Sequence, residues 1–497
     1  MAKEIFGSSS ESNFILNLNP KKVDKAAFYM LLCLFAFTAV AGIFMQFIGG
    51  LDLLPSMVLM VFGLAIFVLA LISALKSMYD RQYTWIGIFF GLSIAFALVS
   101  SFLGVDYMTS LLGFEGRGEG VLALAVYYSV FLVASRFSKE LTGKFFDIVI
   151  GIGLFHILWS ILQIIPIGGW FKNVYKHLFA VLNINNYIPH GTLGSPFIMI
   201  SLFAMLSMIA IVLFTKTQSK KKQIYYAVSA CLFLFFMCKT SALAGIISAA
   251  TVLCIGIITF LVAKIKDYKK WFVLMYSVLA VGVGIAACFV LPDLYPTTES
   301  GGEKTGFSYT DTGIIYTDSN RRLDAGGFLD YNYAPFDVSS PVSLYSYYWK
   351  DGFSNASSYP MGIGPDCYIW TQVDKIANVV TISNTFDKPY NDYLYILSTR
   401  GIMGMVAYAG ILLIAFIKAK KSPQRMIVYS GGAAYLLCMM LNFSAIESAP
   451  LFFFILGLSF ANYNRIDKIV DDTSSGEKSE PKVIEKTKPK KRFALKG

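Results

Sequence analysis

The side chains best suited to chemistry lie in the polar segments between long apolar runs. The candidate cations are Arg117, Lys239, Arg321, Arg322, Lys388 and Arg400. The candidate proton acceptors are His190, Tyr390 and Asp392, and Asn391 lies between the last two. Cations suit an anionic ligand, and a carboxylate or imidazole can take a proton from a hydroxyl group. A tyrosine with a pKa near 10 is a weaker base at neutral pH.

Each of these residues also has a purely structural interpretation. Arg117 and Lys239 suit an anchor at lipid headgroups, where long cationic side chains extend toward water. Asn391 and Asp392 precede an apolar run and are natural helix N-caps. Tyr390 is equally typical of an aromatic residue at a membrane interface. Both interpretations stay open at this point for every candidate.

The composition indicates a membrane protein. Of the 497 residues, 56% are hydrophobic and only 15% are charged, whereas soluble domains have roughly 25% charged residues. The net charge of +11 is spread over the segments between apolar runs and the C-terminal tail, so we expect no nucleic-acid partner. The chain has no Cys-x-x-Cys pair and only three histidines, far apart. We therefore expect neither a metal site nor a cofactor.

The elements that must position the candidates are apolar helices. A helix needs about 20 apolar residues to cross a bilayer, and about twelve runs approach this length. They are 26–49, 54–75, 84–103, 120–135, 145–165, 193–214, 223–238, 241–262, 271–291, 393–417, 426–442 and 450–463. The predicted fold class is an all-α polytopic membrane protein with about twelve transmembrane helices.

The charge distribution predicts the orientation. Lys and Arg collect in cytoplasmic segments of membrane proteins. With the N-terminus inside, every inner loop is basic, including 220–222, 264–270 and 418–425. This predicts a cytoplasmic segment 1–25, helices 1–9 over 26–291, a large extracytoplasmic loop over 292–390, helices 10–12 over 391–463, and a basic, disordered cytoplasmic tail over 464–497.

The apolar runs themselves contain almost no ionisable residues. Asp147 lies near the inner end of its run, and Glu447 falls in the last outer loop. Charged residues inside a membrane mark ion or substrate pathways. Their scarcity argues against a coupled transporter or a polysaccharide flippase. We expect the function to face outward.

Several motifs together resemble the O-antigen ligase and polymerase superfamily, particularly its Gram-positive members. The segment Lys388-Pro389-Tyr390-Asn391-Asp392-Tyr393-Leu394 is similar to a Lys-Pro-His-Asn-x-Tyr-Leu motif of that family. Upstream, Tyr348-Trp349-Lys350 and Gly362-Ile363-Gly364-Pro365-Asp366 match an Ile-Trp-Lys segment and a Gly-x-Gly-Pro-Asp segment in order and spacing. The segments 116–120 and 190–196 resemble further outer motifs of the family.

The resemblance implies an integral-membrane glycosyltransferase. Such proteins move a glycan from a polyprenyl-pyrophosphate carrier to a hydroxyl acceptor at the outer face of the bacterial cytoplasmic membrane. It assigns the catalytic positions to Tyr390, Asn391 and Asp392. Arg117, Lys239, His190, Arg321, Arg322, Lys388 and Arg400 are then the substrate-binding candidates. The implied partners are a lipid-linked oligosaccharide, a glycan or lipid acceptor, membrane lipid and other polysaccharide-assembly proteins.

This chain departs from the family pattern where catalysis is expected. Position 390 is Tyr instead of His, and the helix end that usually reads Ser-Arg reads Ser241-Ala242, with Lys239 the nearest cation. Two hypotheses follow. The chain is either an active polymerase or ligase with substituted groups, or a non-catalytic relative that binds lipid-linked glycan or organises an assembly complex.

Overall fold

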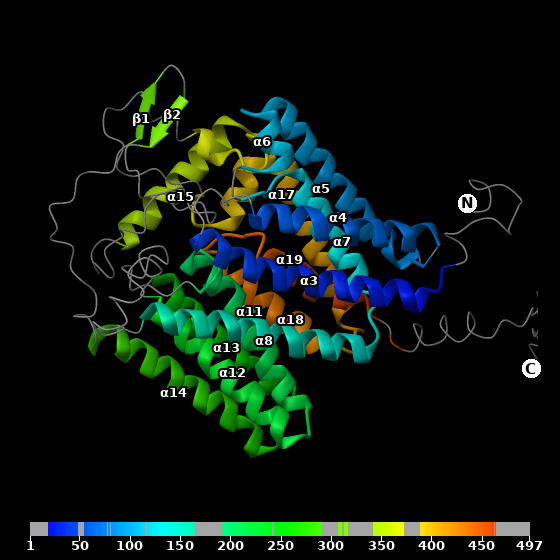
Figure 1. Ribbon diagram of the computed structural model, residues 1–497, viewed down its shortest axis with the longest axis vertical. Coiled ribbons are helices and arrows are strands. Elements are labelled where there is room, and N and C mark those ends of the chain that lie inside the picture. The colour runs from blue at the N-terminus through cyan, green and yellow to red at the C-terminus, as the bar shows by residue number, and fades with distance from the viewer. Residues whose placement is uncertain are drawn as a thin grey trace, which may run out of the picture.

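The computed structural model describes residues 18–47, 54–76, 78–79, 81–114, 117–164, 191–240, 243–290, 307–310, 313–316, 341–371, 388–461 and 463. Within these ranges the chain is a bundle of helices with one antiparallel hairpin, β1 (Phe307–Thr310) and β2 (Gly313–Tyr316), in which Phe307 pairs with Tyr316 (Figure 1). The candidates His190, Arg321 and Arg322 lie outside the described residues, as does the predicted tail over 464–497.

A helix covers most of each predicted apolar run, although the runs 193–214, 426–442 and 450–463 extend past the ends of their helices. These helices are α3 (Pro20–Phe47), α4 (Leu54–Leu75), α5 (Thr84–Leu103), α7 (Val121–Ala134), α8 (Lys139–Ile164), α11 (Pro196–Lys216), α12 (Lys220–Lys239), α13 (Leu243–Val262), α14 (Tyr268–Val290), α17 (Asp392–Ala419), α18 (Arg425–Cys438) and α19 (Ala449–Gly457), which continues as η3 (Leu458–Phe460). A short η1 (Arg81–Tyr83) precedes α5, and α6 (Tyr107–Leu112) and α15 (Pro341–Ser358) lie outside the apolar runs.

The helical, polytopic membrane architecture is confirmed in this coarse form. In the described part of the chain, eight helices are long and apolar enough to cross a membrane. Two others, over Val121–Ala134 and Ala449–Phe460, are apolar but shorter. The count of about twelve crossings and the large outer loop stay predictions.

Local sequence sets where the helices near the site begin. Ser195 caps α11, because its hydroxyl accepts hydrogen bonds from the backbone N–H groups of Phe197 and Ile198, and Pro196 occupies the first helical turn. Asn391 caps α17 in the same way, with two N–H···O contacts of 3.1 Å. These caps fix where two helices near the candidate site begin.

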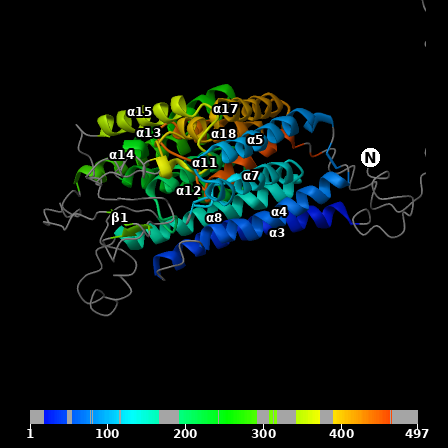
Figure 2. The ribbon, with the colours of Figure 1, turned by 90° about the horizontal axis from the view of Figure 1, so that it is seen from above.

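Helix α11 forms the centre of the bundle. In its most apolar stretch 83% of the residues are buried, against 28% for α4 and α14, which face outward. It packs against α12, α13 and α18, while α3, α4 and α8 lie together on the other side in Figure 2. The outer helices therefore expose apolar side chains that suit a lipid environment, and most of α11 packs against protein.

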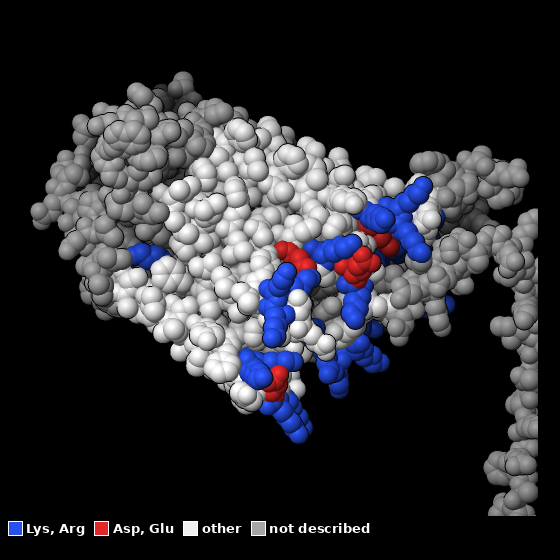
Figure 3. Space-filling view, turned by 60° about the horizontal axis from the view of Figure 1, so that its bottom comes forward, with Lys and Arg blue, Asp and Glu red and all other residues white. Residues whose placement is uncertain are grey.

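The two ends of the bundle differ in charge. Figure 3 shows Lys and Arg gathered toward one end of the visible face, with wide uncharged surface beyond them. This end carries the start of α3, α8 and α12, the end of α17 and the loop between α13 and α14. The other end carries the start of α11 and α17 and helix α15 (Figure 1), and Lys388 and the 390–392 segment lie at the start of α17.

Candidate functional site

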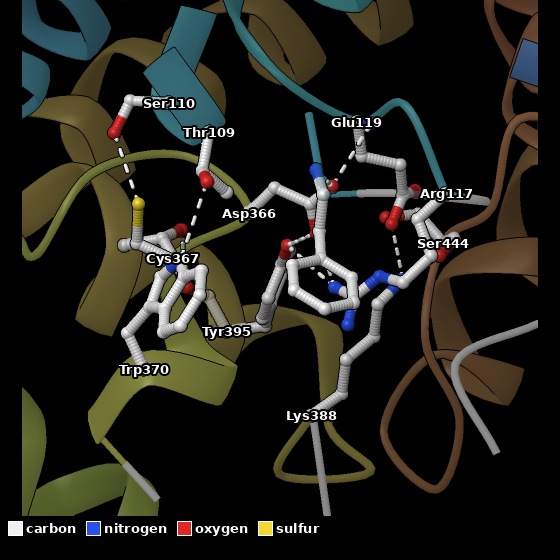
Figure 4. Close-up of polar contacts among 12 residues, drawn as sticks. Thr109, Ser110, Arg117, Glu119, Asp366, Cys367, Trp370, Lys388, Tyr395 and Ser444 are labelled. Atoms are coloured by element: carbon white, nitrogen blue, oxygen red, sulfur yellow. Dashed lines mark hydrogen bonds and ion pairs between the residues drawn. The ribbon is translucent and has the colours of Figure 1, made fainter. Parts of the chain in front are cut away.

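A single carboxylate organises the loop that carries Arg117. The Asp366 side chain is fully buried and forms an ion pair with the Arg117 guanidinium. It also accepts hydrogen bonds from the backbone N–H groups of Phe114 at 2.7 Å and Glu119 at 3.1 Å, and from the Tyr395 hydroxyl at 3.1 Å (Figure 4). Asp366 thus joins the 113–120 loop to α17.

The chain around Asp366 takes backbone conformations that the sequence motif permits. Gly362 and Gly364 have φ values of 90° and 101°, in the region that favours glycine. Asp366 itself has φ 60°. Contacts from α6 hold this turn, including an oxygen–sulfur distance of 3.1 Å from Ser110 to Cys367. The Gly-x-Gly-Pro-Asp segment therefore shapes a turn whose last residue points its carboxylate inward.

A second buried ion pair lies beside the first. Lys388 donates to the Glu119 carboxylate and, at 2.8 Å, to the carbonyl oxygen of Ser444. Its ammonium lies over the Phe443 ring at 4.5 Å and the Tyr395 ring at 5.2 Å. Lys388 is 1% exposed and Glu119 is 6% exposed. The charge of each partner is therefore compensated inside the protein.

Burial controls the ionisation of the acidic groups here. Loss of solvent raises the pKa of Glu119 to about 7, although the Lys388 ammonium opposes the shift. Burial also raises the pKa of Glu447 to about 8; the Glu119 carboxylate adds to this shift, and the Lys388 ammonium opposes it. Both carboxyl groups consequently titrate near neutral pH.

The three predicted catalytic positions have structural roles in this arrangement. The Tyr390 ring stacks on Tyr348 at 4.8 Å and meets Phe197 edge-on at 4.9 Å. Asn391 caps α17, and the Asp392 carboxylate accepts hydrogen bonds from the backbone N–H and, at 2.7 Å, the hydroxyl group of Ser444. The capping interpretation of Asn391 is confirmed. A catalytic role for Tyr390, Asn391 or Asp392 stays a prediction.

Arg400 differs from the other buried cations. It lies on α17 just before Gly401, where φ of 70° kinks the helix, and its side chain is 8% exposed. Within the described part of the chain, its guanidinium forms no ion pair, and its Nε is buried without a hydrogen-bond partner. Its charge acts on several buried tyrosines, among them Tyr127 and Tyr395, and opposes the rise of their pKa values. The Tyr127 hydroxyl also lacks a hydrogen-bond partner in this part of the chain.

The structure brings most of the described candidates together. Arg117, Lys388 and the 390–392 segment share one buried cluster through Asp366, Tyr395 and Ser444. Lys239 lies at the end of α12, where its ammonium donates to the carbonyl oxygen of Ala287 on α14 at 3.3 Å. No contact among the described residues joins it to the cluster.

Sequence reasoning missed the acidic members of the site. Glu119 and Asp366 were visible only as parts of glycine-rich motifs, and Glu447 was placed in an outer loop. In the sequence these carboxylates share only a position near glycine or other small residues. Acidic residues in surface turns have the same kind of neighbours, so this pattern does not indicate a buried site. The partners of Arg117 and Lys388 lie 249 and 269 residues away in sequence, so no local pattern could reveal them.

Comparison with known families agrees with the motifs. Residues 227–409 match the family model described as O-antigen ligase. This segment of the chain is therefore similar to the O-antigen ligase family, and the resemblance to the ligase and polymerase superfamily is confirmed. The matched segment includes Lys239, Asp366, Lys388, the 390–392 motif and Arg400. Comparisons with curated proteins and with solved structures gave no match.

Proposed function

We propose that this protein transfers a glycan from a polyprenyl-pyrophosphate carrier to a hydroxyl acceptor at the outer face of a bacterial cytoplasmic membrane. The product is a surface polysaccharide, so the protein acts as a polymerase or a ligase. The match to the O-antigen ligase family supports the substrate class. The basic end of the bundle supports cytoplasmic termini, which puts the buried polar cluster on the outer side.

The single observation that carries this proposal is the state of Arg400. A buried guanidinium without a counter-charge is costly, because an isolated ion loses its hydration without compensation. Arg117 and Lys388 are already neutralised by Asp366 and Glu119. Arg400 has no such carboxylate among the described residues. A diphosphate would supply the missing negative charge, and the planar guanidinium can bind it with two hydrogen bonds.

The test is binding and turnover of a polyprenyl-pyrophosphate oligosaccharide by the purified protein in detergent. We expect Arg400→Ala to weaken donor binding and to lower transfer at least a hundredfold, whereas Arg400→Lys retains part of both. Arg425→Ala is the matched control, since this residue starts α18 at the basic end. Unchanged binding and transfer in Arg400→Ala would overturn the role of Arg400.

One observation favours the alternative of binding without transfer. The position that is His in the family motif is Tyr390, which packs in an aromatic group with φ of 47°. Saturable donor binding, with no release of the carrier pyrophosphate under conditions where an active relative turns over, would support a non-catalytic role. Measurable transfer by the wild-type protein would exclude it.

A further inference from the structure

Helix α17 is interrupted directly after Arg400. Gly401 has φ 70° and ψ −177°, values that no α-helix contains, so α17 consists of two helical parts joined at this residue. Arg400 ends the first part, and Ile402 begins the second. The position of the Arg400 guanidinium therefore depends on how the two parts are held relative to each other.

A short loop segment holds the two parts together. Residues 360–364, the strap, run across α17 at the break and form hydrogen bonds with both of its parts. The backbone N–H groups of Ile363 and Gly364 each donate at 2.9 Å to a carbonyl oxygen near the end of the first part. The N–H group of Ile402, at the start of the second part, donates at 3.1 Å to the carbonyl oxygen of Pro360. The strap thus satisfies backbone groups that the break removes from the helical pattern.

Glycines allow the strap to approach the break at backbone distance. A Cβ at Gly362 of the strap would lie 2.5 Å from the carbonyl oxygen of Thr399, and a Cβ at Gly401 would lie 2.5 Å from a strap carbonyl oxygen. The end of α5 contacts the strap equally closely, since a Cβ at Gly104 would lie 2.1 Å from the Ile363 carbonyl oxygen. The strap is therefore in backbone contact with both α5 and α17 and has little room to shift.

A further glycine makes room for the Arg400 side chain itself. Gly404 lies four residues after Arg400, and a Cβ at Gly404 would lie 2.5 Å from the Arg400 Cβ, 3.7 Å from its Cγ and 3.9 Å from its Cδ. In an unbroken helix, Cβ atoms four residues apart are separated by about 5–6 Å. The break therefore brings the aliphatic stem of Arg400 into the space that a side chain at position 404 would occupy.

Packing, and not a polar partner, holds Arg400 in place. Arg400 is 8% exposed, and within the described part of the chain its guanidinium forms no ion pair and its Nε has no hydrogen-bond partner. The contacts that remain to fix the side chain are those of its stem with Gly404 and those of the strap with the backbone around the break.

We propose that Gly404 and the strap are positioning elements for Arg400, an inference that rests on the proposed function. Gly404 leaves the space along which the Arg400 stem runs, and the strap fixes the two parts of α17 on either side of it. Both act on the donor diphosphate only through the guanidinium. A side chain that is already held in its binding conformation loses little freedom when the ligand arrives, so a displaced stem should weaken binding.

The experiment measures binding of polyprenyl pyrophosphate, which carries the diphosphate but no glycan, by the full chain in detergent. We expect Gly404→Ala to raise the Kd about tenfold, because the added Cβ displaces the Arg400 stem. Gly410→Ala is the matched control on the same helix, where a Cβ would lie 2.2 Å from the Phe89 ring and far from Arg400. Its Kd should stay within about twofold of the wild type, and thermal unfolding of each variant reports its stability.

A double-mutant cycle separates positioning from a general effect on the fold. Arg400→Ala keeps the Cβ that Gly404→Ala would crowd, so the strain at the break is the same in both backgrounds. Only the guanidinium is missing. We therefore expect Gly404→Ala to lower the unfolding temperature equally in both backgrounds, yet to raise the Kd by less than about twofold once Arg400 is Ala.

The outcomes decide between the hypotheses. An unchanged Kd in Gly404→Ala, or an equal rise in Kd in both backgrounds, would overturn the positioning role and leave the proposed function intact. Wild-type protein that does not bind polyprenyl pyrophosphate would contradict the proposed function, on which the inference rests.

A second variant tests the strap and serves if Gly404→Ala does not fold. Pro360→Ala replaces an exposed side chain and gives the strap backbone more freedom. Its Kd should rise about threefold in the wild-type background and stay unchanged in Arg400→Ala. An unchanged Kd in both backgrounds, or an equal rise in both, would overturn the role of the strap.

Discussion

The buried pair between Lys388 and Glu119 allows a quantitative test of the site. Lys388→Met removes the ammonium and leaves the Glu119 carboxyl group 6% exposed without its cation. Breaking a buried ion pair from one side costs about 3–5 kcal/mol, because the remaining carboxyl group must either stay charged without its cation or take up a proton. The apolar double variant Glu119→Leu with Lys388→Met removes both charges. It should lie within about 1 kcal/mol of the wild type or be more stable.

The pH dependence of the single variant follows from the same geometry. In the wild type, the pKa of Glu119 is raised from 4.5 to about 7, and Lys388 keeps it from rising further. Without Lys388 the folded protein holds this proton to higher pH, while the unfolded chain has already lost it. The variant therefore continues to lose stability above about pH 7, by up to ~1.4 kcal/mol per pH unit, and the wild type does not.

The free energy of unfolding can be measured by reversible detergent titration in mixed micelles, followed by tryptophan fluorescence at pH 7 and pH 8.5. Lys144→Met is the control, because the Lys144–Glu140 pair on α8 is exposed and should contribute nothing measurable. Equal stability of Lys388→Met and wild type at both pH values would refute the buried-pair interpretation. So would a double variant as unstable as the single one.

Three further predictions use the same measurement. Burial raises the pKa of Glu447 from 4.5 to about 8, so the contribution of the protonated Glu447 to stability is complete below pH 4.5 and is lost as the pH rises toward 8. The free energy of unfolding of Glu447→Gln should lack this decrease, which is up to ~1.4 kcal/mol per pH unit. Parallel pH curves for the variant and the wild type would contradict this prediction. Gly401→Ala should destabilise the protein by at least ~2 kcal/mol, because φ at this position is 70° and a Cβ would lie 2.5 Å from the Met361 carbonyl carbon. Gly143→Ala is the control and should not destabilise the protein, because the space around Gly143 is open. Asn391→Ala should cost about 1–2 kcal/mol through loss of the α17 cap, and an unchanged free energy would show that the cap is dispensable.

Much of the fold could be predicted because the bilayer constrains it. An apolar run near 20 residues has few alternatives to a helix, since its backbone must satisfy its own hydrogen bonds. Helices α4 and α5 begin and end at the predicted residues. Helix α3 begins at Pro20, earlier than the predicted segment boundary, because the polar residues after Pro20 extend the first turns. Hydropathy reports the apolar core of a helix and not its polar extensions.

Only the residues of the site that lie in recognisable sequence motifs could be predicted. The sequence indicated that Asn391 and Asp392 lie at a helix start, and Asn391 does cap α17. It could not indicate that Glu447 is buried, because burial depends on how the loop after α18 contacts α11. Nor could it distinguish Arg117, which has a carboxylate partner, from Arg400. Both are single arginines beside glycine, and only tertiary contacts separate them.

The contact between Arg117 and Asp366 has a consequence for biogenesis. The two residues are 249 positions apart, so Arg117 leaves the ribosome long before its partner. At roughly 5–20 residues per second, the delay is on the order of 10–50 s. During that time the 113–120 loop has no carboxylate to hold it. We therefore expect the N-terminal helices to enter the membrane as a loose intermediate, which becomes compact only after the chain beyond Asp366 has been synthesised.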